Sequence, residues 1–172
     1  TLPDNDLERL ALAQHHGLAT CLLDWSFNPL VGLYFSCSDL LDQDGAVYCY
    51  DPPAYVDASV LQLKDLTCNG VGFVPRALAG RILNQRAAFT VHIPANLPLE
   101  VSESVALPDH PNLTKLTIPS SLKIEVLKML DDYGINRVTL FPDLDGLSAH
   151  VNWETHKMTR KQFGSARNVW ML

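Results

Sequence analysis

The stretch QHHGLATCLLDWSFNPLVGLYF (residues 14–35) decides how this chain is built. Gly17 is placed to end a helix over residues 4–16, because glycine readily takes the left-handed conformation found at helix ends. Asn28 followed by Pro29 is a favoured helix start, and the run 30–41 is nearly apolar all round, which indicates a buried helix. Between the two helices we predict a polar turn.

Outward from this stretch, helical and strand patterns are mixed without a regular βαβ alternation, which favours an α+β fold. The alternation around Phe89 points Phe89, Val91 and Ile93 to one side of a strand. We predict a single domain over residues 1–172, in which small mixed or antiparallel sheets pack with helices. The expected strands are 47–50, 87–93, 113–118 and 135–140, and the expected helices are 119–133 and 147–156. Loop and short-helix structure over the surface is expected at 54–80, and a loop at 95–112.

Composition excludes several classes of protein. The net charge of -6 and the pI near 5.4 oppose nucleic-acid binding through phosphates, although a local basic groove stays open as an alternative. No stretch is apolar enough to cross a bilayer. The four cysteines lie singly, without zinc spacing, as in proteins of a reducing compartment. We therefore expect a cytoplasmic protein with no metal site, which also agrees with the isolated positions of His150 and His156.

The same stretch resembles the hallmark of FRG domains, a bacterial family. That hallmark reads QH, a variable residue, G, then TRLLDW and a helix that begins with NP and ends in LYFA. The family also shows a later arginine, glutamine, glycine and phenylalanine, and a C-terminal FPDLDGL that residues 141–147 repeat. The chain matches this pattern at Gln14, His15, Gly17, Thr20, Leu22, Leu23, Asp24, Trp25, Asn28, Pro29, Leu33, Tyr34, Phe35, Arg81, Gln85 and Phe89.

The chain departs from the family pattern at three places. Cys21 stands where the hallmark has arginine, Ala87 stands where a glycine is usual, and the Phe-Arg-Gly element that names the family is absent. The sequence begins at Thr1, so we expect it to lack its N-terminal motif. An activity that needs the hallmark arginine, or the arginine of the Phe-Arg-Gly element, would be lost in this chain.

The resemblance points to a candidate site. His15 can exchange a proton near neutral pH and Asp24 can orient an imidazole or a cation, so these two are the candidate catalytic residues. Arg81 can bind a carboxylate or phosphate through two hydrogen bonds. The candidate ligand-binding residues are Gln14, Gly17, Thr20, Trp25, Arg81 and Gln85.

Each of these residues also has a purely structural interpretation. His15 would cap carbonyl groups at a helix end, and Asp24 would bond the backbone of a buried turn. Arg81 and Gln85 would brace the surface of a helix. Asp145 would serve as the N-cap of the last helix rather than as part of a cation-binding loop.

Two hypotheses about function follow. The layout is similar to that of ADP-ribosyltransferase-type folds, which bind NAD in a cleft between two small sheets, and this similarity implies ADP-ribosyl transfer or NAD hydrolysis with NAD as the substrate. No other cofactor is implied. The alternative is a non-catalytic module of a mobile element or phage-conflict system that binds a small anionic ligand or a protein partner. A cleft would favour the first hypothesis, and polar groups satisfied internally would favour the second.

Overall fold

The computed structural model describes residues 3–58, 63–66, 70–76, 85–95 and 112–164. Its first element, α1 (Asp6–His15), begins where the Asn5 side chain accepts a hydrogen bond from Leu7 N at 2.8 Å. It ends before Gly17, whose φ of 87° is the left-handed conformation that the sequence predicted there. Leu7 and Ala11 are buried and face the first sheet.

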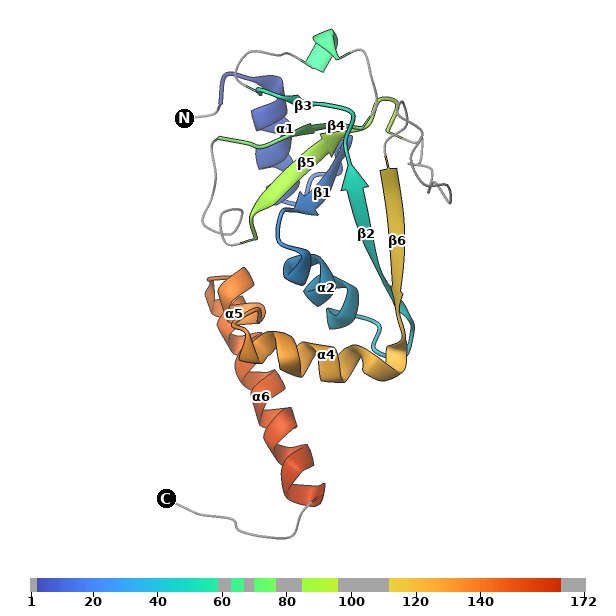
Figure 1. Cartoon of the computed structure of the whole chain (residues 1–172). Helices are drawn as coiled ribbons and strands as arrows, with labels where there is room; N and C mark the ends of the chain where they lie inside the picture. The colour runs from blue at the N-terminus through green and yellow to red at the C-terminus, as the bar shows by residue number, and fades with distance from the viewer. Residues whose placement is uncertain (1–2, 59–62, 67–69, 77–84, 96–111, 165–172) are drawn as a thin grey trace.

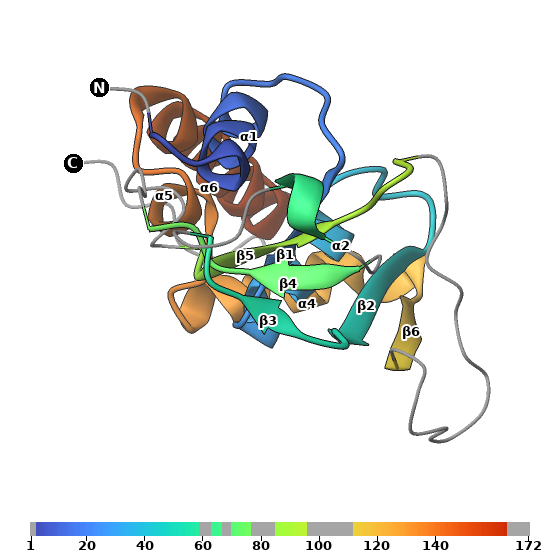
Figure 2. The same ribbon diagram turned by 90° about the horizontal axis from the view of Figure 1, so that it is seen from above.

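This first sheet has four strands in the order β1 (Leu22–Ser26), β5 (Ala87–Val91), β4 (Val71–Phe73) and β3 (Tyr55–Val56). The three pairings are antiparallel, antiparallel and parallel. Figures 1 and 2 show α1 covering one face of this sheet. A hydrophobic core fills the space between them and consists of Leu7, Ala11, Leu22, Ala58, Phe73, Phe89 and Val91.

The second sheet is an antiparallel ribbon of β2 (Gly45–Asp51) and β6 (Asn112–Ile118). In Figure 1 it runs along the side of the molecule, from the first sheet to a layer of helices. That layer contains α2 (Pro29–Ser38), α4 (Ser120–Asp132), α5 (Arg137–Leu140) and α6 (Leu144–Gly164). Its own core includes Val31, Tyr34, Cys37, Leu127, Leu130 and Leu140. The predicted α+β class, with small sheets packed against helices, is confirmed.

Several local predictions were wrong. The connection between α1 and α2, where a polar turn was predicted, contains a strand at residues 22–26, because β5 supplies a partner that periodicity within residues 14–35 cannot show. Residues 71–73, predicted as a surface loop, are a fully buried strand. Residues 135–140 contain the helix α5 instead of a strand, since Asn136 and Thr139 form a capping box.

The last helix begins at Leu144, three residues before the predicted start, and continues to Gly164. Asp143, and not Asp145, makes the capping bond, because its Oδ1 accepts from Gly146 N at 2.7 Å. No helix in the described part of the chain is long and apolar enough to span a membrane.

The connection from α2 to β2 depends on a buried lysine. Lys123 of α4 is 2% exposed, and its Nζ donates hydrogen bonds to Asp39 O at 2.8 Å, Leu40 O at 3.1 Å and Gln43 O at 3.1 Å. An ammonium group has three donors, so all of them are used. The lysine thus fixes the loop that leads to Gly45, the first residue of β2.

Replacing Lys123 by Met should lower the free energy of unfolding by about 2–4 kcal/mol, because three buried carbonyl groups would lose a charged donor. Urea unfolding measures this change. The matched control is Lys128→Met, on the exposed side of the same helix, which should change stability by no more than about 0.5 kcal/mol. Equal losses in the two variants would contradict the role given to Lys123.

A cleft between the two sheets

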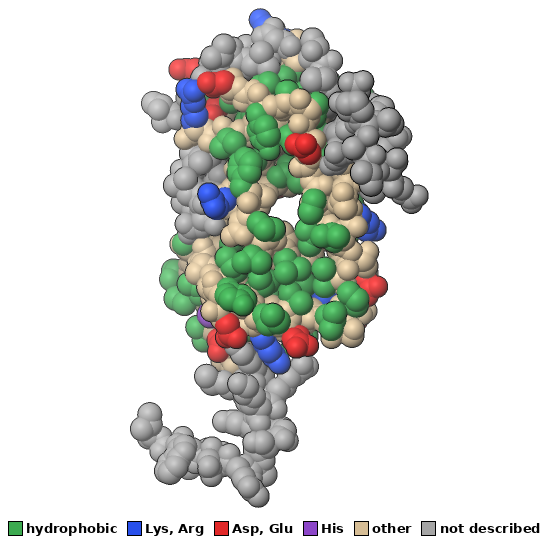
Figure 3. Space-filling view, viewed as in Figure 1, with side chains coloured by type: hydrophobic (Ala, Val, Ile, Leu, Met, Phe, Trp, Pro, Cys, Tyr) green, Lys and Arg blue, Asp and Glu red, His purple; other side chains and the backbone are tan. Residues whose placement is uncertain are grey.

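The strand β1 separates the α1 core from a cleft. Alternation along the strand turns Leu22 toward α1 and turns Leu23 and Trp25 to the opposite face, where Leu23 pairs with Thr90 of β5. The cleft lies between this face, the start of α2 and strand β2, and its volume is about 1100 Å³. In Figure 3 the molecule is hollowed at its centre, between the two bodies of hydrophobic side chains.

Five of the eight predicted site residues line this cleft: Gln14, His15, Asp24, Trp25 and Gln85. Gly17 and Thr20 are near these residues in the sequence, but they are not among the described residues that line the cleft. Arg81 lies outside the described residues. The structure therefore brings together residues from three separate parts of the sequence.

Gln14, Thr20 and Asp24 form a hydrogen-bonded group at one end of the cleft. Gln14 Nε2 donates to Asp24 Oδ2 at 2.8 Å, and the Thr20 hydroxyl donates to Gln14 Oε1. Thr20 Oγ1 in turn accepts from Leu22 N at 3.1 Å. These bonds tie the loop after α1 to the strand β1 and hold the Asp24 carboxylate in one orientation, although Asp24 itself is exposed.

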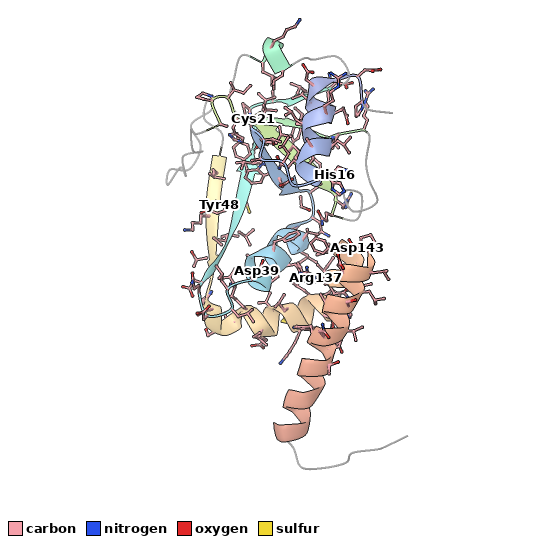
Figure 4. The ribbon with its side chains drawn as sticks, turned by 180° about the vertical axis from the view of Figure 1, so that it is seen from behind. His16, Cys21, Asp39, Tyr48, Arg137 and Asp143 are labelled. Atoms are coloured by element: carbon pink, nitrogen blue, oxygen red, sulfur yellow. The ribbon has the colours of Figure 1, made fainter. Side chains whose placement is uncertain are left out.

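His15 is the last residue of α1 and lines the cleft beside this group. Its ring meets the ring of His16 edge to face, with the centroids 5.3 Å apart. Figure 4 shows His16 at the end of α1. His15 and Asp24 thus lie on the same cleft, and their assignment to catalysis stays a prediction.

Trp25 connects the two sheets. Its ring stacks on Tyr50 of β2 with the centroids 5.1 Å apart, and its Nε1 donates to Thr90 Oγ1 at 2.8 Å. Thr90 Oγ1 lies 2.7 Å from His92 Nε2. Since Thr90 accepts from the indole, its own hydroxyl proton is available to a neutral His92.

Sequence reasoning missed Thr90 and His92. Both are 3% exposed, and burial lowers the pKa of His92 from its usual 6.5. The alternation that predicts Phe89 and Val91 on one side of the strand also predicts Thr90 and His92 on the other side.

Gln85 holds the opposite end of the cleft together. Its backbone carbonyl accepts from Ser26 Oγ at 2.6 Å, and its Nε2 donates to Leu140 O at 3.1 Å. Gln85 thus links β1 to the helix α5. Cys21, which replaces the arginine of the FRG hallmark, packs against the core under α1 and does not belong to the described lining.

Aromatic rings dominate the walls. Phe27 and Tyr55 are 52% and 56% exposed, and their ring centroids are 6.1 Å apart. The Tyr55 ring lies so close to Gly72 that a Cβ atom there would come within 2.8 Å of it. The other aromatic lining residues are Trp25, Phe35, Tyr48, Tyr50, Phe89 and Phe141.

The cleft carries little charge. Asp24 is an acidic group and His15 a titratable base, while no lysine or arginine is found among the described lining residues. The lining also gathers no set of three metal-ligating side chains in the described part of the chain. The arrangement can stack flat rings and accept hydrogen bonds, whereas a phosphate would need a cation from elsewhere.

These features define an α+β protein with a ligand-sized cleft between two sheets. The family model described as FRG domain matches residues 1–45, a stretch that includes α1, β1 and α2. The predicted resemblance is confirmed over that stretch. The further matches at Arg81, Gln85, Phe89 and residues 141–147 lie beyond it. No curated protein and no solved structure matches the chain.

The free energy of unfolding should depend on pH through His92, which follows β5. Because burial lowers the pKa of His92 in the folded chain, its contribution to stability is complete above the unfolded value of 6.5 and is lost as the pH falls toward the folded value. Urea unfolding between about pH 7.5 and about pH 5.5 should therefore show a steeper loss for the unmodified chain than for His92→Gln. Parallel curves for the two proteins would rule out this contribution.

Proposed function

We propose that the cleft binds a nucleotide-like ligand that contains a flat ring, with NAD as the first candidate. The observation that carries this proposal is the exposed aromatic wall formed by Phe27 and Tyr55 beside the Trp25–Tyr50 stack. Stacking of a base on an aromatic side chain contributes about 1–3 kcal/mol. A volume of about 1100 Å³ suits a ligand of this size.

The polar end of the cleft suits the sugar hydroxyls or the carboxamide of such a ligand. A carboxylate is the group that accepts hydrogen bonds from ribose hydroxyls in dinucleotide-binding folds. The bond from Gln14 to Asp24 presets the orientation of the carboxylate, which reduces the entropy lost on binding. In this proposal Arg81 binds the phosphates.

An ADP-ribosyltransferase-type activity is the finer form of this proposal. Two small sheets flank the cleft, as in the layout that the sequence suggested. His15 would exchange the proton and Asp24 would stabilise the positive charge that develops on the ribose as nicotinamide leaves. ADP-ribosyl transfer and NAD hydrolysis differ only in whether a second substrate or water attacks that ribose.

One observation favours the alternative of a non-catalytic module. Gln14, Thr20 and Asp24 satisfy one another through hydrogen bonds, as expected of residues that brace a loop. A module of this kind, in a mobile element or phage-conflict system, would use the same cleft for a ligand or a partner segment and leave it unchanged. Binding without turnover would identify it.

Thermal unfolding with NAD, ADP-ribose and nicotinamide tests the proposal. A ligand at about 100 times its Kd adds about 2.7 kcal/mol to the stability of the folded chain, so NAD should raise the midpoint of unfolding. Tyr55→Ala should remove most of this rise, because it takes away one stacking surface. Tyr133→Ala is the matched control, since Tyr133 is 72% exposed and outside the cleft lining.

No rise with any of the three ligands, in a chain that unfolds cooperatively, would refute the nucleotide proposal. A rise that Tyr133→Ala and Tyr55→Ala reduce equally would place binding outside the cleft. Where NAD binds, release of nicotinamide over time separates the enzyme from the module, and Asp24→Asn should then slow this release while binding persists.

A further inference from the structure

A second set of reactive side chains lies in the helical layer, apart from the cleft lining. Asp131 is near the end of α4, and His150 and Glu154 lie four residues apart on α6. One ligand atom from each residue falls within 4.8 Å of the other two. All three residues are half-buried.

The surroundings hold two of these side chains in place. The spacing of His150 and Glu154 puts both on the same face of α6. The His150 ring stacks on Trp153 with the centroids 6.1 Å apart and the planes 28° apart. Asn136 Nδ2 donates to Asp131 Oδ1 at 2.9 Å. Hydrogen bonds of this kind to a ligating carboxylate are the usual outer support of a metal site.

A cation, the Arg137 guanidinium, belongs to the same helical layer. Arg137, labelled in Figure 4, follows Asn136 in the chain. Its guanidinium lies over the Phe141 ring at 5.1 Å from the centroid. Part of the Arg137 charge therefore faces the aromatic ring that follows α5.

We propose that Asp131, His150 and Glu154 bind a divalent transition-metal ion of the Zn²⁺ type, which joins α6 to α4. Zinc takes one imidazole nitrogen and two carboxylate oxygens at about 2.0–2.2 Å, and water completes the coordination. In a tetrahedral site the ligand atoms lie about 3.3 Å apart. Binding would therefore draw the ligand atoms together from separations that now reach up to 4.8 Å.

The imidazole decides the class of metal. Calcium and magnesium take oxygen ligands almost entirely, and they need six or more of them, whereas a histidine with two carboxylates suits zinc and its neighbours. This proposal replaces the expectation of no metal site. Sequence spacing pairs only His150 with Glu154, because Asp131 reaches these two residues only through the packing of α4 against α6.

Titration of the metal-free chain with ZnCl₂ in a calorimeter tests the site. One ion should bind per chain, and His150→Ala should weaken binding by at least about tenfold. Glu154→Gln, which keeps the shape of the side chain, should weaken it in the same direction. MgCl₂ should give no comparable binding. Circular dichroism of each variant confirms that the helices persist.

The matched control is His16→Ala, which removes an exposed histidine at the end of α1. It should bind zinc as the unmodified chain does. No zinc binding, or binding that is lost in His16→Ala and kept in His150→Ala, would overturn the proposal. Co²⁺ in place of Zn²⁺ supplies a visible absorption band that should disappear in His150→Ala. An unchanged band in that variant would overturn the assignment of His150.

Discussion

The indole of Trp25 sets how the two sheets meet. Its face stacks on Tyr50 of β2, and its nitrogen is bound to Thr90 of β5. Tyr50 is itself fixed, because its hydroxyl donates to Gly70 O at 3.1 Å, next to β4. Each ring is thus held by its face and by its polar edge. The cleft between the sheets is therefore largely formed before any ligand enters.

The polar group at the end of α1, formed by Gln14, Thr20 and Asp24, fixes one end of the same cleft. Gln14 uses its amide to connect Thr20 with Asp24, so the loop between α1 and β1 has a defined path. The residues that identify the FRG hallmark are, in this part of the chain, also the residues that build the strand. A structural and a ligand-binding role for Asp24 are compatible, because one oxygen bonded to Gln14 fixes the direction of the whole carboxylate.

The sequence predicts well those features that depend on residues close together in the chain, and poorly those that depend on distant residues. The Asn28–Pro29 pair and Gly17 act within a few residues, and they correctly placed the start of α2 and the end of α1. The strand β1 depends on its pairing with β5, more than sixty residues away, which no local pattern shows. The five site residues that line the cleft were found through their resemblance to a family pattern, whereas Thr90 and His92 needed the pairing of β1 with β5.

The molecule separates two kinds of chemistry. The described lining of the cleft is aromatic and almost uncharged, which favours a ligand held by its ring. The helical layer holds a buried ammonium at Lys123 and the Asp131, His150 and Glu154 group. The helix α2 packs on both sheets and on α4, so it joins the two regions. A change that loosens α4 from α6 should leave the Trp25–Tyr50 contact in place, since the cleft keeps its shape through contacts made between the sheets.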